Sequence, residues 1–580
     1  MIDLSPWWEC YPGRLEYELK ELQAVGVAVV EDMEARQEGV IRWNLTVPDE
    51  FTGRGELQLI ATFPEFYPLT RPEVEAPGFT MGHHQHPFGK TLCLIGRSSQ
   101  EWGSNKSLAW LITAQLRTAL NLGESGAGGV NEEDQGEPFS DYYTYSHFGV
   151  VLIDSDWSIP EHPAGGEATF RVVGGPVPVQ EGAHTILMAT TLSGTDSATV
   201  AEMPEEIRRA YPAHMEVQGR WSTVEQPISS NDPELIWAAA EVADTEPCAG
   251  NAKAGDVQLR LIAFPEEHSR TSTGTGWMLV IKEVGGWLKP TKADLRSGDR
   301  RKHAPRYVES TYQLVRAGRV GHTDFRARNA HLSGLNNKRV LLIGAGALGS
   351  VISEQLARAG LGALTVIDRD ILEAGNLARH AATIAHVGMP KSLAVHQLVA
   401  STSPYTDVKP IGLNIGSVAQ AVDQRRLMTE EYMTADLVID ASAEVGVQRI
   451  TADLARGAGT PWVMAEGTNG AWGGTVVRVA PGTPWCFSCF EWHRVEGSIP
   501  FPPVEQAPLT QPIGCAEPTF TGAAHDLDEI AMQAVRTAVA VLLNKPSFDV
   551  ANVTLHDPVG PTLPRWTTYP VTKHPDCVHQ

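Results

Sequence analysis

The sequence predicts a multidomain protein of mixed α/β and α+β class, and three observations support that prediction. The chain has 580 residues, more than one hydrophobic core usually serves, so two to four domains are expected. A strand, a glycine-rich turn and a helix follow one another from Val340, which is typical of an α/β nucleotide-binding unit. Helix and strand patterns without such a unit fill the N-terminal part, which favours a separate α+β domain. We expect domains at residues 1–150, 151–315 and 316–580.

The N-terminal domain is expected to begin with a helix and to continue as antiparallel strands. Apolar residues recur at helical spacing over residues 8–25, and Gly26 is a plausible end for that helix. Three prolines within nine residues then exclude a helix or a central strand, so we expect a rigid extended turn there. The expected strands lie at 27–30, 39–47 and 56–63, and a further helix at 108–120.

Cys93 lies in a polar loop between that turn and the later helix. Most free cysteines are small buried apolar residues, and this is one interpretation of Cys93. The loop also contains His83, His84 and His86, which fit a metal site, although no companion Cys/His cluster is near in the sequence. The sequence around the loop favours a third interpretation, a reactive thiol.

The turn and the cysteine loop together resemble the ubiquitin-conjugating enzymes. Their turn, F-P-x-x-Y-P-x-x-x-P, is present in full over residues 63–72, and Trp102 follows the cysteine as it does in that family. The resemblance implies that Cys93 forms a thioester. In the family a His-Pro-Asn begins ten residues before the cysteine, whereas here His83 is followed by His84 and Gln85. The oxyanion or loop support given by that Asn therefore passes to Gln85 or is lost.

The middle of the chain carries no catalytic motif. Cys248 has no partner cysteine nearby and is expected to be inert. We interpret this part as an α+β spacer domain. The expected strands are 142–154, 168–173, 257–264 and 277–281, and the expected helices are 205–211 and 233–243.

The C-terminal domain begins with a nucleotide-binding βαβ unit. Apolar residues 340–343 predict a buried strand, and a G-x-G-x-x-G pattern and a helix follow it. Glycines let the backbone approach a phosphate, whose charge then lies at the helix N-terminus. A second strand ends in two acids, and an acid at this distance can hold a ribose hydroxyl. The residues concerned are Gly344, Gly346, Gly349, Asp368 and Asp370.

Charged residues further along distinguish two kinds of nucleotide site. Asn376 and Arg379 are three residues apart and share a face of a helical turn, Lys391 begins another helix, and Asp440 ends a third strand. A triphosphate that is being cleaved needs such cations to neutralise charge and such an acid to hold Mg²⁺. An NAD(P)-binding module with incidental charges is the alternative.

These elements, in this order over residues 340–445, resemble the ThiF/MoeB family, the adenylating fold of ubiquitin-activating enzymes. The resemblance implies an enzyme that attaches AMP to the C-terminal carboxylate of a small protein. Asp368 would then bind ribose, Arg379 and Lys391 the phosphates of ATP, and Asp440 the Mg²⁺. His380 stands where many relatives carry Gln.

Cysteines near the C-terminus predict a structural zinc site. Cys486 and Cys489 form a C-x-x-C pair, and His574 and Cys577 form a distant second pair, with His579 as a possible substitute ligand. ThiF/MoeB relatives often have two C-x-x-C pairs at similar locations. A redox pair, or a catalytic cysteine within the first pair, are the competing interpretations.

Cys515 is the expected nucleophile of the C-terminal domain. It precedes a predicted helix at 526–543, and a helix N-terminus lowers a thiol pKa. Ubiquitin-activating enzymes place their thioester cysteine on such a crossover loop after the first zinc pair. Cys489 is the alternative.

Composition narrows the function classes. The formal net charge of −23 argues against a general nucleic-acid binder, which needs clustered Lys and Arg. No apolar run reaches the length of a membrane span, and the first residues lack a signal-peptide pattern, so we expect a soluble cytoplasmic protein. Seven scattered cysteines fit reduced thiols rather than a disulfide framework.

The order of the two domains resembles the activating–conjugating fusion proteins of bacterial operons. The best known of these accompany the cyclic-oligonucleotide antiphage systems (CBASS), where they ligate the C-terminus of a CD-NTase to targets; a sister group serves ubiquitin-like operons. The resemblance implies a homodimer that passes a partner's C-terminal tail from Cys515 to Cys93 and then to a target lysine. Two other hypotheses remain: a sulfur-carrier activator of ThiF/MoeB type with a non-catalytic N-terminal binding module, and a non-enzymatic scaffold.

Overall fold

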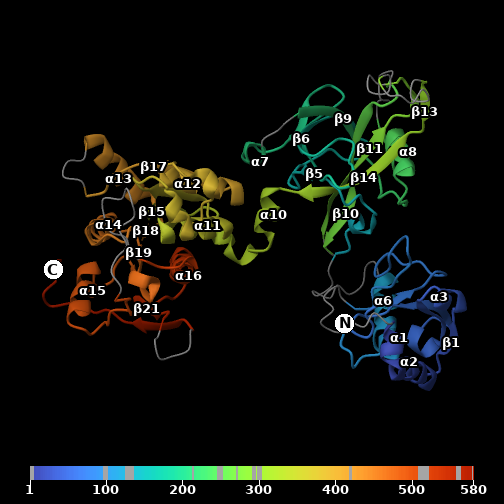
Figure 1. Ribbon diagram of the computed structural model, residues 1–580, viewed down its shortest axis with the longest axis horizontal. Coiled ribbons are helices and arrows are strands. Elements are labelled where there is room, and N and C mark those ends of the chain that lie inside the picture. The colour runs from blue at the N-terminus through green and yellow to red at the C-terminus, as the bar shows by residue number, and fades with distance from the viewer. Residues whose placement is uncertain are drawn as a thin grey trace. The chain divides into compact units, whose positions relative to one another are not determined.

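The computed structural model forms two compact units, each with its own core (Figure 1). Unit 1 comprises residues 1–153, 157–203 and 213–318, and unit 2 comprises 154–156, 204–212 and 319–580. The first two predicted domains thus share unit 1, and their boundary near residue 150 stays a prediction. The structure describes residues 6–95, 102–124, 136–211, 215–244, 252–269, 272–290, 296, 304–416, 421–506, 521–556, 563–577 and 579.

Unit 1 begins with two helices on a four-stranded antiparallel sheet of order β1-β2-β3-β4. The single helix expected at 8–25 is divided, because Pro12 lacks an amide hydrogen and is favoured at the first turn of a new helix. Alternate residues of β2 are buried, so one face of this sheet carries the core. The elements are α1 (Trp7–Cys10), α2 (Pro12–Ala24), β1 (Ala28–Glu31), α3 (Met33–Gln37), β2 (Ile41–Val47), α4 (Asp49–Thr52), β3 (Leu57–Phe63) and β4 (Glu73–Glu75).

The proline-rich turn is anchored to this core. It contains a cis peptide bond before Pro68, and the Tyr67 ring is buried against Trp7. The Tyr67 hydroxyl donates to the buried Glu18 carboxylate, which also accepts the Leu108 amide at 2.8 Å. That second bond ties the turn to the start of the later helical segment. The segment consists of α5 (Leu108–Trp110), the π-helical η2 (Leu111–Leu116) and α6 (Arg117–Glu124).

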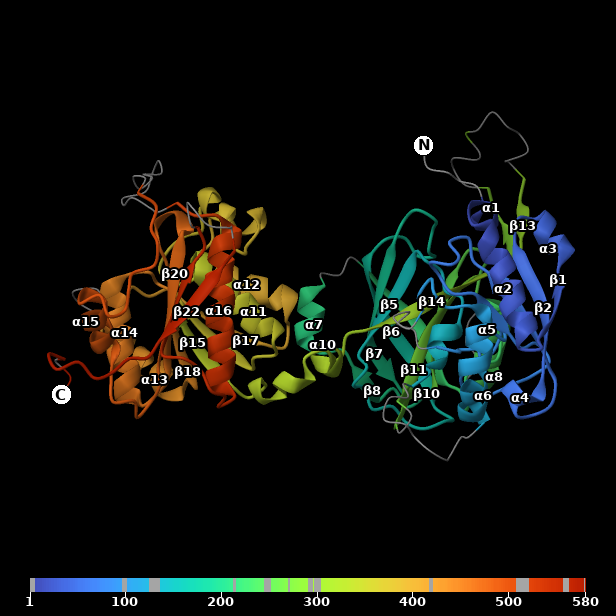
Figure 2. The ribbon, with the colours of Figure 1, turned by 90° about the horizontal axis from the view of Figure 1, so that it is seen from below.

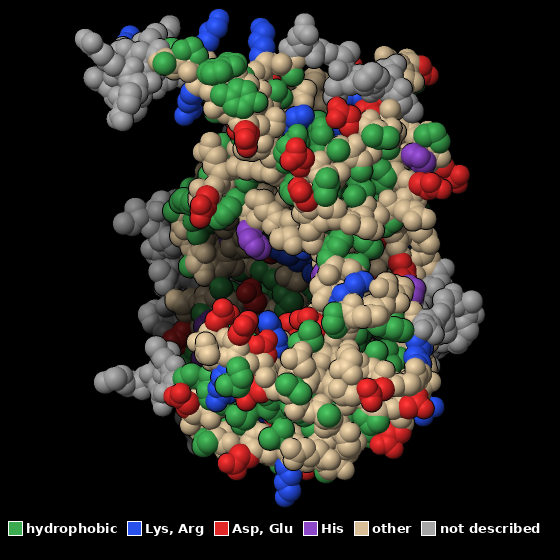
Figure 3. Space-filling view, turned by 90° about the vertical axis from the view of Figure 1, so that its right-hand side faces the viewer, with side chains coloured by type: hydrophobic (Ala, Val, Ile, Leu, Met, Phe, Trp, Pro, Cys, Tyr) green, Lys and Arg blue, Asp and Glu red, His purple; other side chains and the backbone are tan. Residues whose placement is uncertain are grey.

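The rest of unit 1 is an eight-stranded sheet of order β5-β14-β11-β10-β9-β6-β7-β8. Strand β10 buries residues on both faces: Leu261 packs with β6 and β7, whereas Ile262 packs with helix α8. The face of unit 1 drawn in Figure 3 is hollowed, and acidic side chains gather beside the hollow. The strands are β5 (Gly149–Ile153), β6 (Gly165–Gly174), β7 (Thr185–Ser193), β8 (Thr199–Glu202), β9 (Met215–Thr223), β10 (Val257–Ser269), β11 (Ser272–Glu283) and β14 (Thr311–Arg319). The other elements are η3 (Phe139–Tyr142), α8 (Pro233–Ala243), β12 (Gly286–Leu288) and β13 (Arg306–Val308).

Unit 2 is a three-layer α/β domain built on a sheet of order β17-β16-β15-β18-β19-β20-β21-β22. The first five strands are parallel and the last three pairings are antiparallel. Helices α11, α12 and α16 cover one face with one core, while α13, α14 and α15 contribute to a second core on the other face (Figure 2). The predicted α/β and α+β class is confirmed. Among the described residues, no helix is both long and apolar enough to cross a membrane.

The strands of unit 2 are β15 (Arg339–Ile343), β16 (Ala363–Ile367), β17 (Asp407–Ile411), β18 (Leu437–Asp440), β19 (Trp462–Gly467), β20 (Gly473–Val479), β21 (Val550–Thr554) and β22 (Arg565–Tyr569). Its α-helices are α7 (Glu205–Ala210), α10 (His322–Ala327), α11 (Ala347–Arg358), α12 (Lys391–Thr402), α13 (Val422–Thr434), α14 (Val445–Ala458), α15 (Phe487–Val495) and α16 (Ala524–Leu542). Short 3₁₀ turns are η5 (Ala330–Leu335), η6 (Ala374–Ala378), η7 (Ile384–His386) and η8 (Asn469–Ala471).

Candidate active sites and metal site

The glycine-rich loop of unit 2 joins β15 to α11 and is held at both backbone groups of Ala345. The Ala345 amide donates to Asp368 Oδ2 at 2.7 Å, and its carbonyl accepts His380 Nε2 at 2.8 Å. Gly344 adopts a φ of 87°, and a Cβ on Gly349 would lie 1.9 Å from the Gly344 carbonyl oxygen. These two positions therefore require glycine.

Two small cavities adjoin this loop at the carboxyl ends of the parallel strands, where ligands bind in open α/β sheets. The first has a volume of about 160 Å³, and the second of about 110 Å³. Ser442 lines both, so the two cavities adjoin. The first is lined by Gly346, Asn376, Arg379, His380 and Lys391, and the second by Gly344, Asp368, Asp370, Asn414 and Glu444.

The structure thus brings together eight of the nine residues that the sequence predicts for ATP: seven line these cavities, and Gly349 lies in the first turn of α11. Lys391 Nζ lies 3.0 Å from Asp370 Oδ2. Burial lowers the pKa of Arg379, which remains cationic at neutral pH because its ordinary value is so high. The site therefore presents two cations beside the N-terminus of α11, an arrangement suited to phosphate groups.

Asp440, the ninth residue, does not line either cavity. Its side chain is fully enclosed: Oδ1 accepts the Ser442 amide at 3.0 Å and the Ser442 hydroxyl at 2.7 Å, and Oδ2 accepts the Thr451 hydroxyl. Burial raises the pKa of this carboxyl. In this geometry Asp440 orients Ser442, and its assignment as a Mg²⁺ ligand stays a prediction.

Cys93 lies in unit 1 as a half-buried cysteine, and its amide donates to the His84 carbonyl at 2.8 Å. Gln85, the candidate oxyanion donor, is 3% exposed and points inward. Its Nε2 donates to the carbonyls of Phe79 at 2.9 Å and Ala76 at 3.2 Å, and its Oε1 accepts the Met81 amide at 2.8 Å. Gln85 therefore supports the loop.

The other predicted nucleophile, Cys515, lies outside the described residues, as does Cys248. The assignment of Cys515 as a nucleophile therefore stays a prediction.

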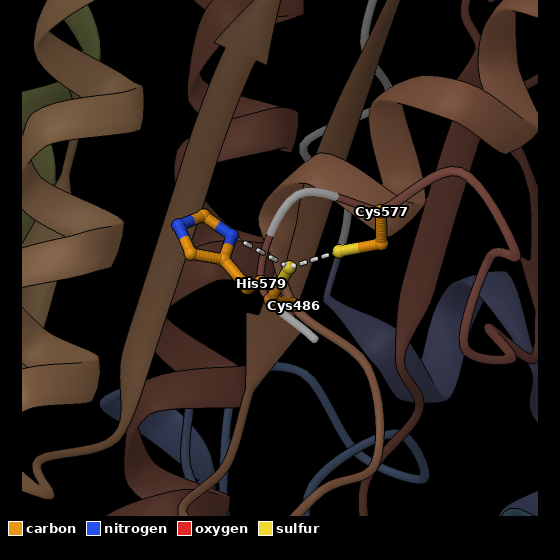
Figure 4. Close-up of side chains that lie close together, drawn as sticks. All are labelled: Cys486, Cys577 and His579. Carbon is orange, nitrogen blue, oxygen red and sulfur yellow. Dashed lines mark hydrogen bonds between the residues drawn. The ribbon is translucent and has the colours of Figure 1, made fainter.

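Near the C-terminus, Cys486, Cys577 and His579 form a close group (Figure 4). Cys486 Sγ lies 3.4 Å from Cys577 Sγ, 3.4 Å from His579 Nδ1 and 3.9 Å from Cys489 Sγ. Edges of roughly 3.5–3.8 Å are what a tetrahedral zinc with these ligands has. The group supplies two thiols and one imidazole, and Cys489 is the candidate for a third thiol; such a donor set fits structural zinc.

The predicted ligand His574 lies outside this group. Its Nε2 lies 2.9 Å from Glu496 Oε1, its Nδ1 accepts the Asp576 amide at 3.1 Å, and its ring stacks on Trp492. Because both ring nitrogens are engaged there, His579 is the better fit as the imidazole ligand.

Comparison with known proteins agrees with both folds. Residues 322–577 match the ThiF family, and residues 30–147 match prokaryotic E2 family B. The C-terminal unit is a ThiF-family domain. An E2-type domain precedes it in the same chain, so the predicted activating–conjugating type of ATP-dependent enzyme is confirmed, as is ATP-dependent adenylation in its general form.

Individual relatives match this chain over different lengths. Uncharacterized protein y4oA of Sinorhizobium fredii is 29% identical over 611 residues, covering 99% of this chain and 98% of the relative. The ATP-dependent ubiquitin transferase-like protein Cap2 of Enterobacter hormaechei is 36% identical over 108 residues, covering 19% of this chain and 18% of Cap2. The crystal structure of Escherichia coli MccB with ATP matches at a TM-score of 0.32 and 18% identity, covering 43% of this chain and 68% of MccB.

Sequence reasoning missed several residues of the nucleotide site, Asn414 among them. Ser442 and Glu444 line the cavities, and the polar residues that directly follow the β18 strand were the available signal. His380 was noted as a departure from the family, but its bond to Ala345 depends on the folded chain and has no sequence signal.

Proposed function

We propose that this chain activates the C-terminal carboxylate of a partner protein with ATP and then joins that carboxyl group to an amine. One observation carries the proposal: a ThiF-family domain whose cavity is lined by a glycine-rich loop, Arg379 and Lys391 lies in one chain with an E2-type domain that holds Cys93. The ThiF-family domain would activate the carboxyl group, and the E2-type domain would receive it and pass it to the amine.

In the first stage, a carboxylate oxygen of the partner attacks the α-phosphorus of ATP, and pyrophosphate leaves. Arg379 and Lys391 neutralise the charge that moves onto the leaving phosphates, and the α11 N-terminus adds a positive dipole. Asp368 is our candidate for the ribose. Mg²⁺ would supply further charge neutralisation, and the acids nearest the cavities, Asp370 and Glu444, are exposed enough to receive it.

In the second stage, the acyl group moves between sulfurs. The Cys515 thiolate attacks the acyl carbonyl and AMP leaves, which gives a thioester. The Cys93 thiolate then attacks that thioester and releases Cys515. Finally a target amine, which we propose is a lysine, attacks the Cys93 thioester, forms an amide and frees the thiol. The thioester intermediates divide one difficult acyl transfer into several easier steps.

Zinc is proposed as a structural metal of unit 2, bound by Cys486, Cys489, Cys577 and His579. Burial raises the pKa of the Cys486 thiol to about 12, so this thiol stays neutral until a bound cation compensates the charge of its thiolate. Zinc would fasten the C-terminal segment to the start of α15.

The partner is proposed from the relatives. The similarity to Cap2 supports the tail of a CD-NTase in a CBASS system and an antiphage role, and the tail of a ubiquitin-like protein is the other candidate. We further propose a cytoplasmic homodimer, as is usual for the family the domain resembles, and no nucleic-acid partner, since the net charge is −23.

The experiment incubates the purified chain with ATP and each candidate tail, and follows adducts on non-reducing gels. Two reductant-sensitive adducts are expected: Cys515→Ala should abolish both, and Cys93→Ala should leave only the first. Cys10→Ala is the control, because Cys10 is an exposed cysteine of the same domain as Cys93. Adenylation without an adduct on Cys93 would favour the sulfur-carrier activator. No pyrophosphate release with any tail would favour the scaffold.

A further inference from the structure

The loop that precedes Cys93 has a backbone that needs an anchor. The Cys93 amide donates to the His84 carbonyl at 2.8 Å, so the position of His84 sets the position of the cysteine. His84 adopts a φ of 58°, a left-handed conformation that residues with a side chain rarely take. Some other group must hold His84 in that conformation.

Glu137 is that group, and it lies near the C-terminal end of the E2-type domain. Its two carboxylate oxygens accept the His84 amide at 2.9 and 3.1 Å, and Oε1 lies 3.5 Å from His84 Nδ1. The Tyr142 hydroxyl donates to the same carboxylate at 3.1 Å and fixes its orientation. Both the Glu137 and the His84 side chains are only 17% exposed, where hydrogen bonds to a charged acceptor are strong.

Neighbouring contacts hold the rest of the loop against residues 139–142 and against β10. His83 Nδ1 lies 3.3 Å from Glu267 Oε2. The His86 ring meets the Tyr142 ring at 4.9 Å between centroids, and the Phe88 ring meets the Phe139 ring at 5.9 Å. The loop is therefore fixed at several points, by the last residues of the E2-type domain and by Glu267 of β10.

We infer that Glu137 is a positioning residue for Cys93. It acts through His84: its carboxylate holds the His84 amide, the His84 carbonyl holds the Cys93 amide, and the thiol is thereby presented to the incoming thioester. This inference rests on the proposed function of Cys93 as an acyl acceptor. Glu267 of β10 contributes to the same anchor, so the part that we interpreted as a spacer also supports the thiol loop.

The inference is tested on the full-length chain with Glu137→Ala and Glu137→Gln. Amide hydrogen exchange of residues 82–93 reports the anchor directly and needs no activity. Glu137→Ala should speed this exchange about tenfold, because the His84 amide loses a charged acceptor, and should slow transfer of the acyl group onto Cys93 by a similar factor. Glu137→Gln keeps one acceptor oxygen. Its exchange rate for residues 82–93 and its rate of acyl transfer onto Cys93 should therefore both lie close to those of the unaltered chain.

Pyrophosphate release and the exchange of β2 and β3 should not change in either variant, because neither depends on this loop. Glu241→Ala is the matched control, an exposed acid on α8 of the same unit. Unchanged exchange in Glu137→Ala would overturn the inference, as would faster exchange throughout unit 1. If the unaltered chain carries no adduct on Cys93, the proposed function fails, and hydrogen exchange alone then decides whether Glu137 anchors the loop.

Discussion

His380 is the residue whose substitution tests most directly how the nucleotide loop is held. It is 7% exposed, its Nε2 donates to the Ala345 carbonyl at 2.8 Å, and its Nδ1 accepts the Ala382 amide at 3.0 Å. One nitrogen donates and the other accepts, so the ring is neutral and in the Nε2–H form. His380→Phe keeps the ring volume and removes both bonds.

The expected magnitude follows from the groups left unpaired. An unsatisfied buried backbone group costs about 1–3 kcal/mol, and two are created, so we expect unit 2 to lose about 2–4 kcal/mol once water from the neighbouring cavity is allowed for. For a domain of this size that lowers Tm by roughly 5–10 °C. The KM for ATP in pyrophosphate exchange should rise about tenfold, because Ala345 belongs to the loop that faces the phosphates.

The controls separate the loop effect from general damage. His331→Phe changes an exposed histidine of the same unit and should leave Tm and KM unchanged. His380→Gln keeps a donor for the Ala345 carbonyl. Its Tm and its KM for ATP should lie between those of His380→Phe and those of His331→Phe. An unaltered KM for ATP in His380→Phe would refute the idea that this histidine holds the loop.

The same histidine predicts a pH dependence. Burial lowers the His380 pKa below its ordinary value of 6.5, and nearby Lys391 adds to this. The unfolded chain therefore binds a proton at a pH where the folded chain does not, so the stabilisation is complete above about 6.5 and is lost as the pH falls through the folded pKa. We expect the KM for ATP to rise with acid in the same window, and this rise should disappear in His380→Gln.

Three further predictions concern the other sites. Gln85→Leu should lower Tm of unit 1 by several degrees and slow acyl transfer to Cys93, because buried carbonyls lose their donor; thermal unfolding and adduct gels measure both. His579→Ala should lower bound zinc about tenfold or more in metal analysis, whereas His574→Ala should keep it, and equal loss in both would contradict the assignment. Asp440→Asn should lower kcat without raising the Mg²⁺ concentration for half-maximal activity, because Asp440 orients Ser442; a raised Mg²⁺ requirement would instead show that Asp440 is a ligand.

Sequence patterns reveal chemistry that depends on residue type. The glycines, Arg379 and Lys391 were predicted because phosphate binding needs these residue types at strand ends and helix starts. Such positions can be recognised in the sequence before the fold is known. The βαβ unit was predicted for a related reason, since buried parallel strands are continuous apolar runs. The eight-stranded sheet of unit 1 was predicted only in part, because some of its pairs, such as β5–β14 and β6–β9, join strands far apart in the chain.

What the sequence could not give is the direction in which a side chain points. Asp440 ends its strand as predicted, yet its carboxylate turns inward to Ser442 and Thr451. His574 and His579 are equivalent as sequence ligands, and only the fold engages the first with Glu496. These choices depend on contacts between distant residues, and a pattern of nearby residues does not contain them.

The two reactive loops share a design that explains which residues were missed. In the nucleotide loop, Ala345 is held at its amide by Asp368 and at its carbonyl by His380. In the thiol loop, His84 is held at its amide by Glu137 and at its carbonyl by the Cys93 amide. In each case one backbone unit beside the chemistry is held at both its amide and its carbonyl, and at least one of the holding groups is remote in the chain. A backbone fixed in this way cannot relax when a charged or acylated group arrives, so the geometry of attack is set before binding. Substitutions at the anchors should therefore change rates even where every residue that carries the chemistry is intact.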